Sequence, residues 1–332
     1  MQNDDSQHSV NAMTRRGFLA TAAVAGTVPG VLSAALEDSE NQGLRVPPGT
    51  TPSRVVKVAA REVIHDATMH RPLLREMIHR VVTTLARTRV ERDAWHALLG
   101  SVEVVGLKFN RSAQSKLGTT GAMAETLIQS LVEAGLTPKQ IVCIEGPPGI
   151  AKRNGTALPR PGFSQTETEF ASGSDQLARV LDQVDAIINV PFLKTHNIAG
   201  LTCSLKNLSH ALVKHPARFH ANRCSPYISD IVGLPAIRDK LRLHLVDAIR
   251  VVYDGGPEAS SGAILNLGVI LASTDPVSVD AIGLEILNDA RARAGLTPVA
   301  HGAEQVPYLR AAHESGLGIG ARYAVNLVQP PL

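Results

Sequence analysis

The feature that most constrains the fold is the aliphatic run of residues 185–193, DAIINVPFL, which ends abruptly at Lys194. A short apolar run of this kind fits a strand that is buried on both faces of a parallel sheet. The chain continues over residues 194–207 as KTHNIAGLTCSLKN. Because ligands of open α/β sheets bind beyond the carboxyl ends of the strands, we predict that the Lys-Thr-His tripeptide points into a ligand crevice. In the alternative interpretation, Lys194 and Lys206 are solvated loop residues.

Apolar runs and amphipathic segments alternate along the rest of the chain. This order of strand, helix and strand favours right-handed crossovers and a parallel sheet. We therefore predict an α/β fold in which helices cover both faces of a mostly parallel sheet and a ligand crevice lies at the carboxyl ends of the strands. The predicted strands are 55–60, 102–109, 141–145, 185–193, 241–249 and 265–273, and the predicted helices are 72–85, 119–134, 176–184, 204–214, 277–288 and 304–314.

The amino-terminal segment carries an arginine pair followed by an uncharged stretch. Residues 14–19 read TRRGFL, the uncharged stretch covers 17–36, and small residues stand at 33–35. This arrangement resembles a twin-arginine signal peptide. We predict a cleaved signal over residues 1–35, transport by the twin-arginine translocation machinery, a periplasmic or extracytoplasmic location, and no stable membrane span after cleavage. About twenty apolar residues can span a bilayer, so an uncleaved anchor is the alternative, but the Ala-, Gly- and Thr-rich composition favours cleavage.

Residues 36–53 are polar and rich in Pro and Gly, which predicts a linker. Residues 54–332 are enough for a single α/β domain. Within it, the Gly- and Pro-rich segment 146–174 follows a predicted strand directly and is too long for an ordinary connection. We predict that this excursion is either a surface loop or a lid over the crevice.

Composition excludes some classes of partner and cofactor. Removing residues 1–35 takes away two basic and two acidic residues, so the net charge stays at +3. Binding to a phosphate backbone needs clustered Lys and Arg, so nucleic acid is not an expected partner. Cys143, Cys203 and Cys224 are too few for a four-cysteine iron–sulfur cluster within this chain. A disulfide between Cys203 and Cys224 is conceivable in an oxidising compartment, although a protein that folds before export usually keeps buried, reduced thiols.

Four predicted strands end in polar residues of similar kinds. If these strands are neighbours in one parallel sheet, their ends share one crevice, which suits a small anionic ligand beside a cation. The residues concerned are Lys108, Asn110, Lys194, Thr195, His196, Asp247, Asp254 and Asp275. Asp275 before Pro276 is also a typical helix N-cap, and Asp254 begins a glycine-rich turn.

The lysines suggest the chemistry of such a crevice. Lys108, Lys194 and Lys206 fit phosphate or carboxylate oxygens as point charges, and Asn110 and Asn207 add neutral donors. Crowding of like charges in a partly dry cleft lowers the pKa of lysine, which suits a general base or an imine-forming amine.

A divalent metal is a second expectation for the same crevice. His196 or His220, with Asp254 or Asp275, offers imidazole and carboxylate ligands. Twin-arginine export often carries proteins that acquire a cofactor before transport, which favours a bound metal. A solvent-exposed or hydrogen-bonded role is the ordinary alternative for each histidine.

Several segments together resemble a known family. They are LKFN at 107–110, INVPFLKTHNIAGLTCSLKN at 188–207, LVDAI at 245–249, DGGP at 254–257, ASTDPVSVDAIG at 272–283 and GLGIG at 316–320. The chain is thereby similar to the domain-of-unknown-function 362 family, and the Pro191 to His196 and Leu205 to Asn207 segments are the most specific. The resemblance implies twin-arginine export for many members and fusion to ferredoxin-type domains for some. This chain lacks the ferredoxin module, so no electron-transfer role is carried over, and the family implies no established reaction.

These observations predict an exported protein with a Lys/His/Asp site for a small anionic molecule and a divalent metal. In the enzyme hypothesis, Lys194, His196 and Lys206 are the catalytic residues. The ligand-binding residues are then Lys108, Asn110, Thr195, Asn207, Asp247 and Asp275, and the metal ligands are His220 and Asp254. The alternatives are a non-catalytic solute- or metal-binding protein and an assembly factor for a redox partner.

Overall fold

The computed structural model describes residues 43–65, 68–260 and 262–332. The predicted signal of residues 1–35 and the first part of the predicted linker lie outside these residues. Within the described part of the chain, no helix has both the length and the apolar character that a bilayer crossing requires.

The centre of the fold is a nine-stranded sheet in which most strands run in one direction. The spatial order is β13, β1, β12, β11, β8, β4 and β5, with β9 beside β11 and β10 beside β9. Only β12, which is antiparallel to both β1 and β11, and β10, which is antiparallel to β9, reverse the direction among these strands. The strands are β1 (Ser53–Ala59), β4 (Val105–Lys108), β5 (Ile141–Ile144), β8 (Ala186–Asn189), β9 (Phe192–His196), β10 (Gly200–Thr202), β11 (Leu241–Val252), β12 (Ile264–Ser273) and β13 (Val325–Val328).

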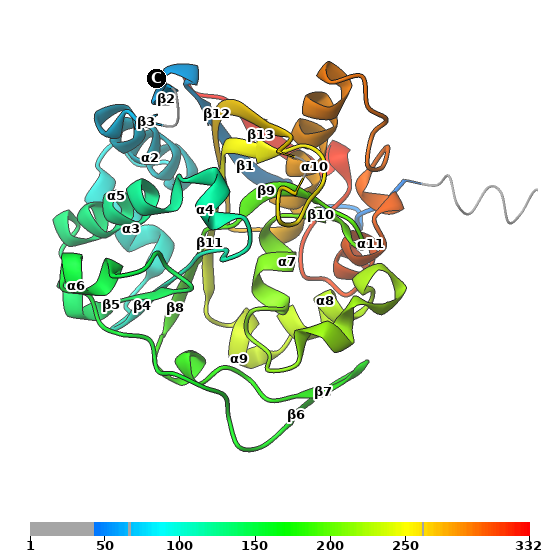
Figure 1. Ribbon diagram of the computed structural model, residues 1–332, viewed down its shortest axis with the longest axis horizontal. Helices are drawn as coiled ribbons and strands as arrows, with labels where there is room; N and C mark the ends of the chain where they lie inside the picture. The colour runs from blue at the N-terminus through cyan, green and yellow to red at the C-terminus, as the bar shows by residue number, and fades with distance from the viewer. Residues whose placement is uncertain (1–42, 66–67, 261) are drawn as a thin grey trace, which may run out of the picture. The chain divides into compact units, whose positions relative to one another are not determined.

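Helices cover both faces of the sheet, as the aliphatic strands predict. Alternate residues of β1 show why, because Val56 and Val58 belong to one hydrophobic cluster and Val55 belongs to the other. Helices α2 (Arg71–Ala86), α3 (Glu91–Leu99) and α5 (Thr120–Glu133) lie on one face, on the left of Figure 1. Helices α7 (Ser204–Ser209), α8 (Tyr227–Val232), α10 (Pro276–Arg293) and α11 (Pro307–Glu314) lie on the other face. The predicted α/β fold is therefore confirmed.

Short elements complete the described chain. Two hairpins lie outside the central sheet, and several single helical turns connect the larger elements. These elements are β2 (Ile64–His65), β3 (Thr68–Met69), β6 (Thr168–Phe170), β7 (Gly173–Asp175), α4 (Gln114–Leu117), α6 (Ile150–Asn154), α9 (Pro235–Arg238), η1 (Arg61–Val63), η2 (Pro138–Gln140), η3 (Arg179–Asp182), η4 (Pro216–Cys224), η5 (Ala303–Gln305) and η6 (Arg322–Ala324).

The predicted strand over residues 185–193 is present but interrupted. It forms β8, breaks at Val190 and Pro191, and resumes as β9 along the same neighbour, β11. Because β9 continues past Leu193, Lys194 and His196 belong to the strand itself rather than to a loop after it. This extension carries both side chains beyond the level at which β4 and β5 end, since Lys108 of β4 pairs with Asn189 of β8.

The direction of β12 corrects one prediction. The strand is antiparallel to β11, with His244 opposite Ser273, so its carboxyl end leads away from the edge at which β4, β5 and β9 end. Asp275 therefore does not share a crevice with the other strand ends. Instead its side chain accepts hydrogen bonds from the N–H groups of Val277 and Ser278 and caps α10. The N-cap interpretation of Asp275 is the one that the structure supports.

Candidate functional site

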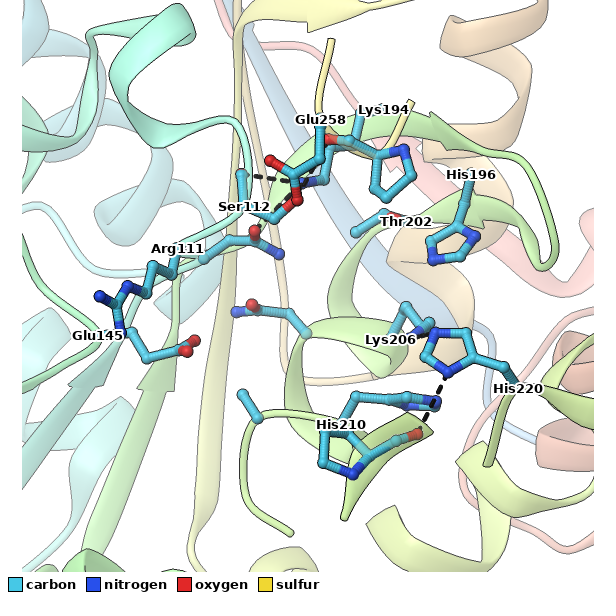
Figure 2. Close-up of a pocket in the computed structure, with 15 residues that line it drawn as sticks. Arg111, Ser112, Glu145, Lys194, His196, Thr202, Lys206, His210, His220 and Glu258 are labelled. Carbon is cyan, nitrogen blue, oxygen red and sulfur yellow. Dashed lines mark hydrogen bonds between the residues drawn. The ribbon is translucent and has the colours of Figure 1, made fainter. Parts of the chain in front are cut away.

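A cavity of about 620 Å³ opens beside β9, at the carboxyl edge of the parallel strands. Its lining combines amines, imidazoles and carboxylates that come from six separate segments of the chain (Figure 2). The titratable lining residues are Arg111, Glu145, Lys194, His196, Lys206, His210, His220 and Glu258. Lys194, His196 and Lys206, which the sequence predicts to be the catalytic residues, thus line one cavity.

Helix α7 brings Lys206, Asn207 and His210 to the cavity. Hydrogen bonds to a side chain of α10 hold its first turn in place. The buried carboxylate of Asp280 on α10 accepts hydrogen bonds from the N–H groups of Ser204 at 2.6 Å and of Leu205 at 3.1 Å. These two groups are among the unpaired donors at the start of any helix. Asp280 therefore fixes the position of α7. In the sequence, Asp280 lies within a predicted helix and nothing there indicates this role.

Lys194 is fully buried against the cavity wall and is held by three acceptors. Its Nζ lies 3.1 Å from Asn110 Oδ1 and 2.9 Å from both the carbonyl oxygen and the hydroxyl oxygen of Ser112. Burial lowers the pKa of Lys194 to about 7, opposed by the carboxylate of Glu258 and reinforced by the ammonium group of Lys206. Both protonation states of this amine are thus accessible near neutral pH.

Glu258 links Lys194 to the opposite loop through Ser112. The Ser112 hydroxyl donates to Glu258 Oε1 at 2.6 Å, and the N–H of Ala113 donates to Oε2 at 3.2 Å. The loop that carries Glu258 packs directly on β9, because a Cβ at Gly256 would meet the carbonyl oxygen of Thr195 at 1.9 Å. Only glycine fits this approach.

A second buried lysine supports the floor of the cavity without lining it. Lys108 Nζ donates to Glu145 Oε2 at 2.8 Å and to Asn207 Oδ1 at 3.3 Å. Burial lowers the pKa of Lys108, while the charge of Glu145 raises it. Lys108 thus positions Glu145 and Asn207, both of which line the cavity. The sequence predicts Lys108 to be a ligand-binding residue, but the structure places it one layer behind the cavity wall.

Lys206 is a buried cation of the cavity whose charge has little compensation from neighbouring acceptors. Burial lowers its pKa to about 8, and its Nζ donates to His220 Nε2 at 3.4 Å. No carboxylate within the described ranges forms an ion pair with it. The Oγ1 of Thr202, which also lines the cavity, is buried and has no hydrogen-bond partner in the described structure. A buried ammonium group without a carboxylate partner, as at Lys206, favours an external anion.

Hydrogen bonds determine the tautomer of His196. Its Nδ1 accepts from the N–H groups of Ile198 and Ala199, both at 3.2 Å, so the proton of the neutral ring is on Nε2. Burial, together with the charge of Lys206, lowers the pKa of His196 to about 3. His196 is consequently a neutral donor rather than a cation or a metal ligand.

Two more histidines and a cysteine gather at one end of the cavity. One ligand atom each from His210, His220 and Cys224 lies within 4.8 Å of the other two. The ring of His220 stacks on His196 with centroids 5.7 Å apart and meets the ring of His210 edge-on at 4.5 Å. Of this group, the sequence predicts only His220 to be a metal ligand.

Besides Lys108 and Asp275, three more predicted ligand residues lie outside the cavity lining. Asp247 is buried in the sheet, where it accepts from Thr119 Oγ1 at 2.5 Å and burial raises its pKa to about 6. Asp254 accepts from Arg291 at 3.0 Å, so it anchors a turn and does not join His220. Thr195 is buried in β9, where its hydroxyl oxygen accepts from the N–H of Gly256 at 3.0 Å.

The sequence predictions do not include six of the polar residues that line the cavity. One of them is Thr202 of β10. Ser112, Arg111, Glu145 and Glu258 follow strand ends directly or lie in a turn, so a search of all polar residues after strands would have found them. His210 carries only the weak signal of a histidine near a lysine.

The excursion of residues 146–174 does not line the cavity, so the structure does not support the lid hypothesis. It forms α6 and the β6–β7 hairpin, and the hairpin lies at the lower edge of Figure 1. The ring of Phe170 meets that of Phe219 edge-on at 5.5 Å, and the excursion thereby contacts η4, which carries His220. All three cysteines are free and buried, so the conceivable Cys203–Cys224 disulfide is absent.

Fold and cavity together define an α/β protein with a cavity lined by lysines, histidines and carboxylates at the edge of a mostly parallel sheet. Residues 105–285 match a family described as a domain of unknown function (DUF362), and since the match covers more than half of the chain, the protein belongs to that family. The family resemblance found in the sequence is therefore confirmed. No curated protein matches the chain.

Two solved structures are remotely similar. The lactate racemase apoprotein from Thermoanaerobacterium thermosaccharolyticum shares 11% identity at a TM-score of 0.39, over 72% of this chain and 60% of that chain. A protein from Thermotoga maritima shares 14% identity at a TM-score of 0.36, over 70% of this chain and 61% of that chain. The chain thus spans about three fifths of each of these proteins.

Proposed function

We propose that the protein is an exported enzyme that binds a small carboxylate- or phosphate-bearing molecule in the cavity and exchanges a proton with it through Lys194. The observation that carries the proposal is Lys206, a buried cation of the cavity lining that forms no ion pair with a carboxylate of the described chain. An anionic oxygen in the cavity gives this ammonium group a charged partner.

The charge balance of the cavity supports an anionic ligand. Glu145 forms an ion pair with Lys108. Glu258 is connected to Lys194 by the Ser112 hydroxyl, which accepts from Lys194 and donates to Glu258. Lys206 and the exposed Arg111 then remain as the cations that face the cavity. His196 adds a neutral N–H donor. Such a donor orients an anionic ligand by a hydrogen bond and adds no positive charge to the cavity.

The position of Lys194 supports a role in proton transfer. Its amine lies at the wall of the cavity, and its neighbours are an amide, a carbonyl and a hydroxyl rather than a directly bound carboxylate. A buried lysine with a pKa near 7 is matched to acid–base chemistry at neutral pH. The twin-arginine signal in the sequence supports transport of this enzyme out of the cytoplasm.

Thermal unfolding with small anions tests the binding part of the proposal. Phosphate, malonate and citrate are added to the purified chain, and the rise in melting temperature reports binding. We expect Lys206→Ala to abolish the rise that one of these anions causes in the wild type, and the exposed control Lys152→Ala to retain it. If Lys206→Ala and Arg111→Ala both keep the full rise, the cavity is not the anion site.

A non-catalytic binding protein is the second candidate, and one observation favours it. The three acceptors around Lys194 match the three protons of an ammonium group, so the charged form is fully hydrogen-bonded. Incorporation of solvent deuterium into a bound carboxylate, followed by NMR, separates the two candidates. An enzyme of the proposed kind exchanges a substrate proton, whereas a binding protein stabilised by the same anion does not.

A further inference from the structure

We propose that His210, His220 and Cys224 form a binding site for a first-row transition-metal ion of intermediate softness, with Zn²⁺ as the reference ion. The site lies at the end of the cavity that η4 closes. It is distinct from the predicted pair of His220 and Asp254, because Asp254 is bound to Arg291. It goes beyond the proposed anion binding and does not depend on it.

The first support is the closeness of three donor atoms from two parts of the chain, the end of α7 and η4. Their ligand atoms lie within 4.8 Å of one another, and two of the three residues are buried. In a tetrahedral zinc site the donor atoms lie roughly 3.5 Å apart, given bond lengths of about 2.0 to 2.3 Å. The group therefore needs a contraction of about 1 Å to surround an ion.

The second support is the hydrogen bonding of the two imidazoles. His220 donates Nδ1–H to the carbonyl oxygen of Pro216 at 3.2 Å, which leaves a lone pair on Nε2. His210 donates Nε2–H to the carbonyl oxygen of Phe219 at 3.1 Å, so its Nδ1 is unprotonated and accepts a hydrogen bond from the Ser209 hydroxyl at 2.8 Å. A backbone carbonyl behind a histidine is the arrangement that orients metal ligands in proteins. Each ring therefore offers one unprotonated nitrogen.

The third support is the backbone that carries the thiol. Asn222, Arg223 and Cys224 have φ angles of 49°, 53° and 65°, in the left-handed region. For residues other than glycine this conformation costs roughly 1–2 kcal/mol each, and such strain concentrates at functional sites. Here the turn brings the Cys224 sulfur to the two histidines instead of continuing as a helix.

The donor set selects the class of ion. Two imidazoles and one thiolate suit Zn²⁺ and its neighbours in the first transition row, and they do not suit Mg²⁺ or Ca²⁺, which prefer oxygen. Three protein ligands leave one position of a tetrahedron for an exogenous ligand, the pattern of reactive rather than structural sites. Because His210 and His220 both line the cavity, that position faces the space near Lys206.

Binding changes the Cys224 S–H bond and two hydrogen bonds. The ion takes the Nδ1 lone pair of His210, so the Ser209 hydroxyl gives up its hydrogen bond at 2.8 Å. The Cys224 thiol loses its proton to solvent when its sulfur coordinates the ion. The ion also takes the Nε2 lone pair of His220, so Lys206 gives up its hydrogen bond at 3.4 Å and becomes free to contact an anion in the cavity.

The test uses the untagged full chain after dialysis against a chelator, with the metal alone and no anion. Co²⁺ gives a sulfur-to-metal charge-transfer band when a thiolate binds it, and competition with Zn²⁺ gives the affinity for zinc. We expect one equivalent of metal, loss of the band in Cys224→Ser, and at least a roughly 100-fold weaker affinity in His220→Ala, since even changes behind the ligands cost about 10- to 100-fold. Cys143→Ser, a matched change of another buried cysteine, keeps both the band and the affinity.

Two outcomes would overturn the site. One is an absence of stoichiometric binding by wild-type protein that is shown to be folded. The other is binding that Cys224→Ser and His220→Ala leave unchanged. His220 is half-buried and not part of the hydrophobic clusters, so His220→Ala keeps the test informative if Cys224→Ser fails to fold. Because no anion is present, failure here leaves the anion proposal intact, and the reverse also holds.

Discussion

At the scale of single residues, Lys194 shows how burial and hydrogen bonding oppose each other. Burial brings its pKa to about 7, while three acceptors and the nearby Glu258 favour the charged form. The neutral fraction of such an amine rises from roughly a tenth at pH 6 to roughly nine tenths at pH 8. As a general base, Lys194 is active only in that neutral form.

We therefore expect the rate of deuterium exchange into a bound substrate to rise about tenfold between pH 6 and pH 8 and then to level off. Lys194→Arg keeps the positive charge but stays protonated, so it retains anion binding and loses exchange by at least about 100-fold. Lys214→Arg, an exposed change of the same kind, has no effect. Exchange that survives in Lys194→Arg would assign the base to another residue.

At the scale of elements, local patterns in the sequence predict where strands and helices lie. They do not predict the direction in which a strand runs. The aliphatic runs predict the strands and Asp275-Pro276 predicts the start of α10, because both signals are local. The antiparallel direction of β12 has no local signal, since a buried strand has the same composition in either direction. This is why Asp275 lies away from the cavity that Lys194 and Lys206 line.

Element η4 depends on the excursion that precedes it. The buried carboxylate of Asp175, at the end of β7, accepts from both the backbone N–H and the ring Nδ1 of His215 at 2.8 Å. His215 immediately precedes η4, so this contact fixes the start of the segment that carries His220 and Cys224.

Replacing Asp175 should therefore loosen η4 as a unit. We expect Asp175→Ala to lower the free energy of unfolding by about 1–3 kcal/mol, because three donors, the N–H groups of His215 and Gln176 and the ring of His215, lose their acceptor. The affinity for Zn²⁺ should fall as well, although no ligand is changed. Urea denaturation and the cobalt titration measure the two effects, and the exposed Asp182→Ala serves as the control. Unchanged metal affinity in a destabilised Asp175→Ala protein would show that η4 keeps its shape without this anchor.

At the scale of the whole molecule, the candidate site is a product of tertiary structure. His210 and Cys224 are fourteen positions apart and share no helical face, so spacing alone does not predict that they meet. They meet because Asp280 holds α7 and Asp175 holds η4. Residues that act through such anchors are visible only once the chain is folded.

The proposal that the chain folds before transport is consistent with its cysteines and with the proposed metal site. All three cysteines are free and buried, so the described fold does not require an oxidising compartment to form disulfides. A site made of two histidines and a cysteine also requires the folded chain, since its ligands come from α7 and η4. A route that carries folded proteins allows metal loading to precede export.

We therefore expect export to depend on the arginine pair and folding not to depend on it. In a bacterial host, the double replacement Arg15→Lys and Arg16→Lys should retain the full chain in the cytoplasm, where it has the same thermal stability as the exported protein. The control pair Arg89→Lys and Arg92→Lys changes two exposed arginines and leaves export intact. Cell fractionation with immunoblotting measures both. Export of the Arg15→Lys, Arg16→Lys protein at the wild-type level, or export in a host without the twin-arginine translocase, would assign the chain to another route.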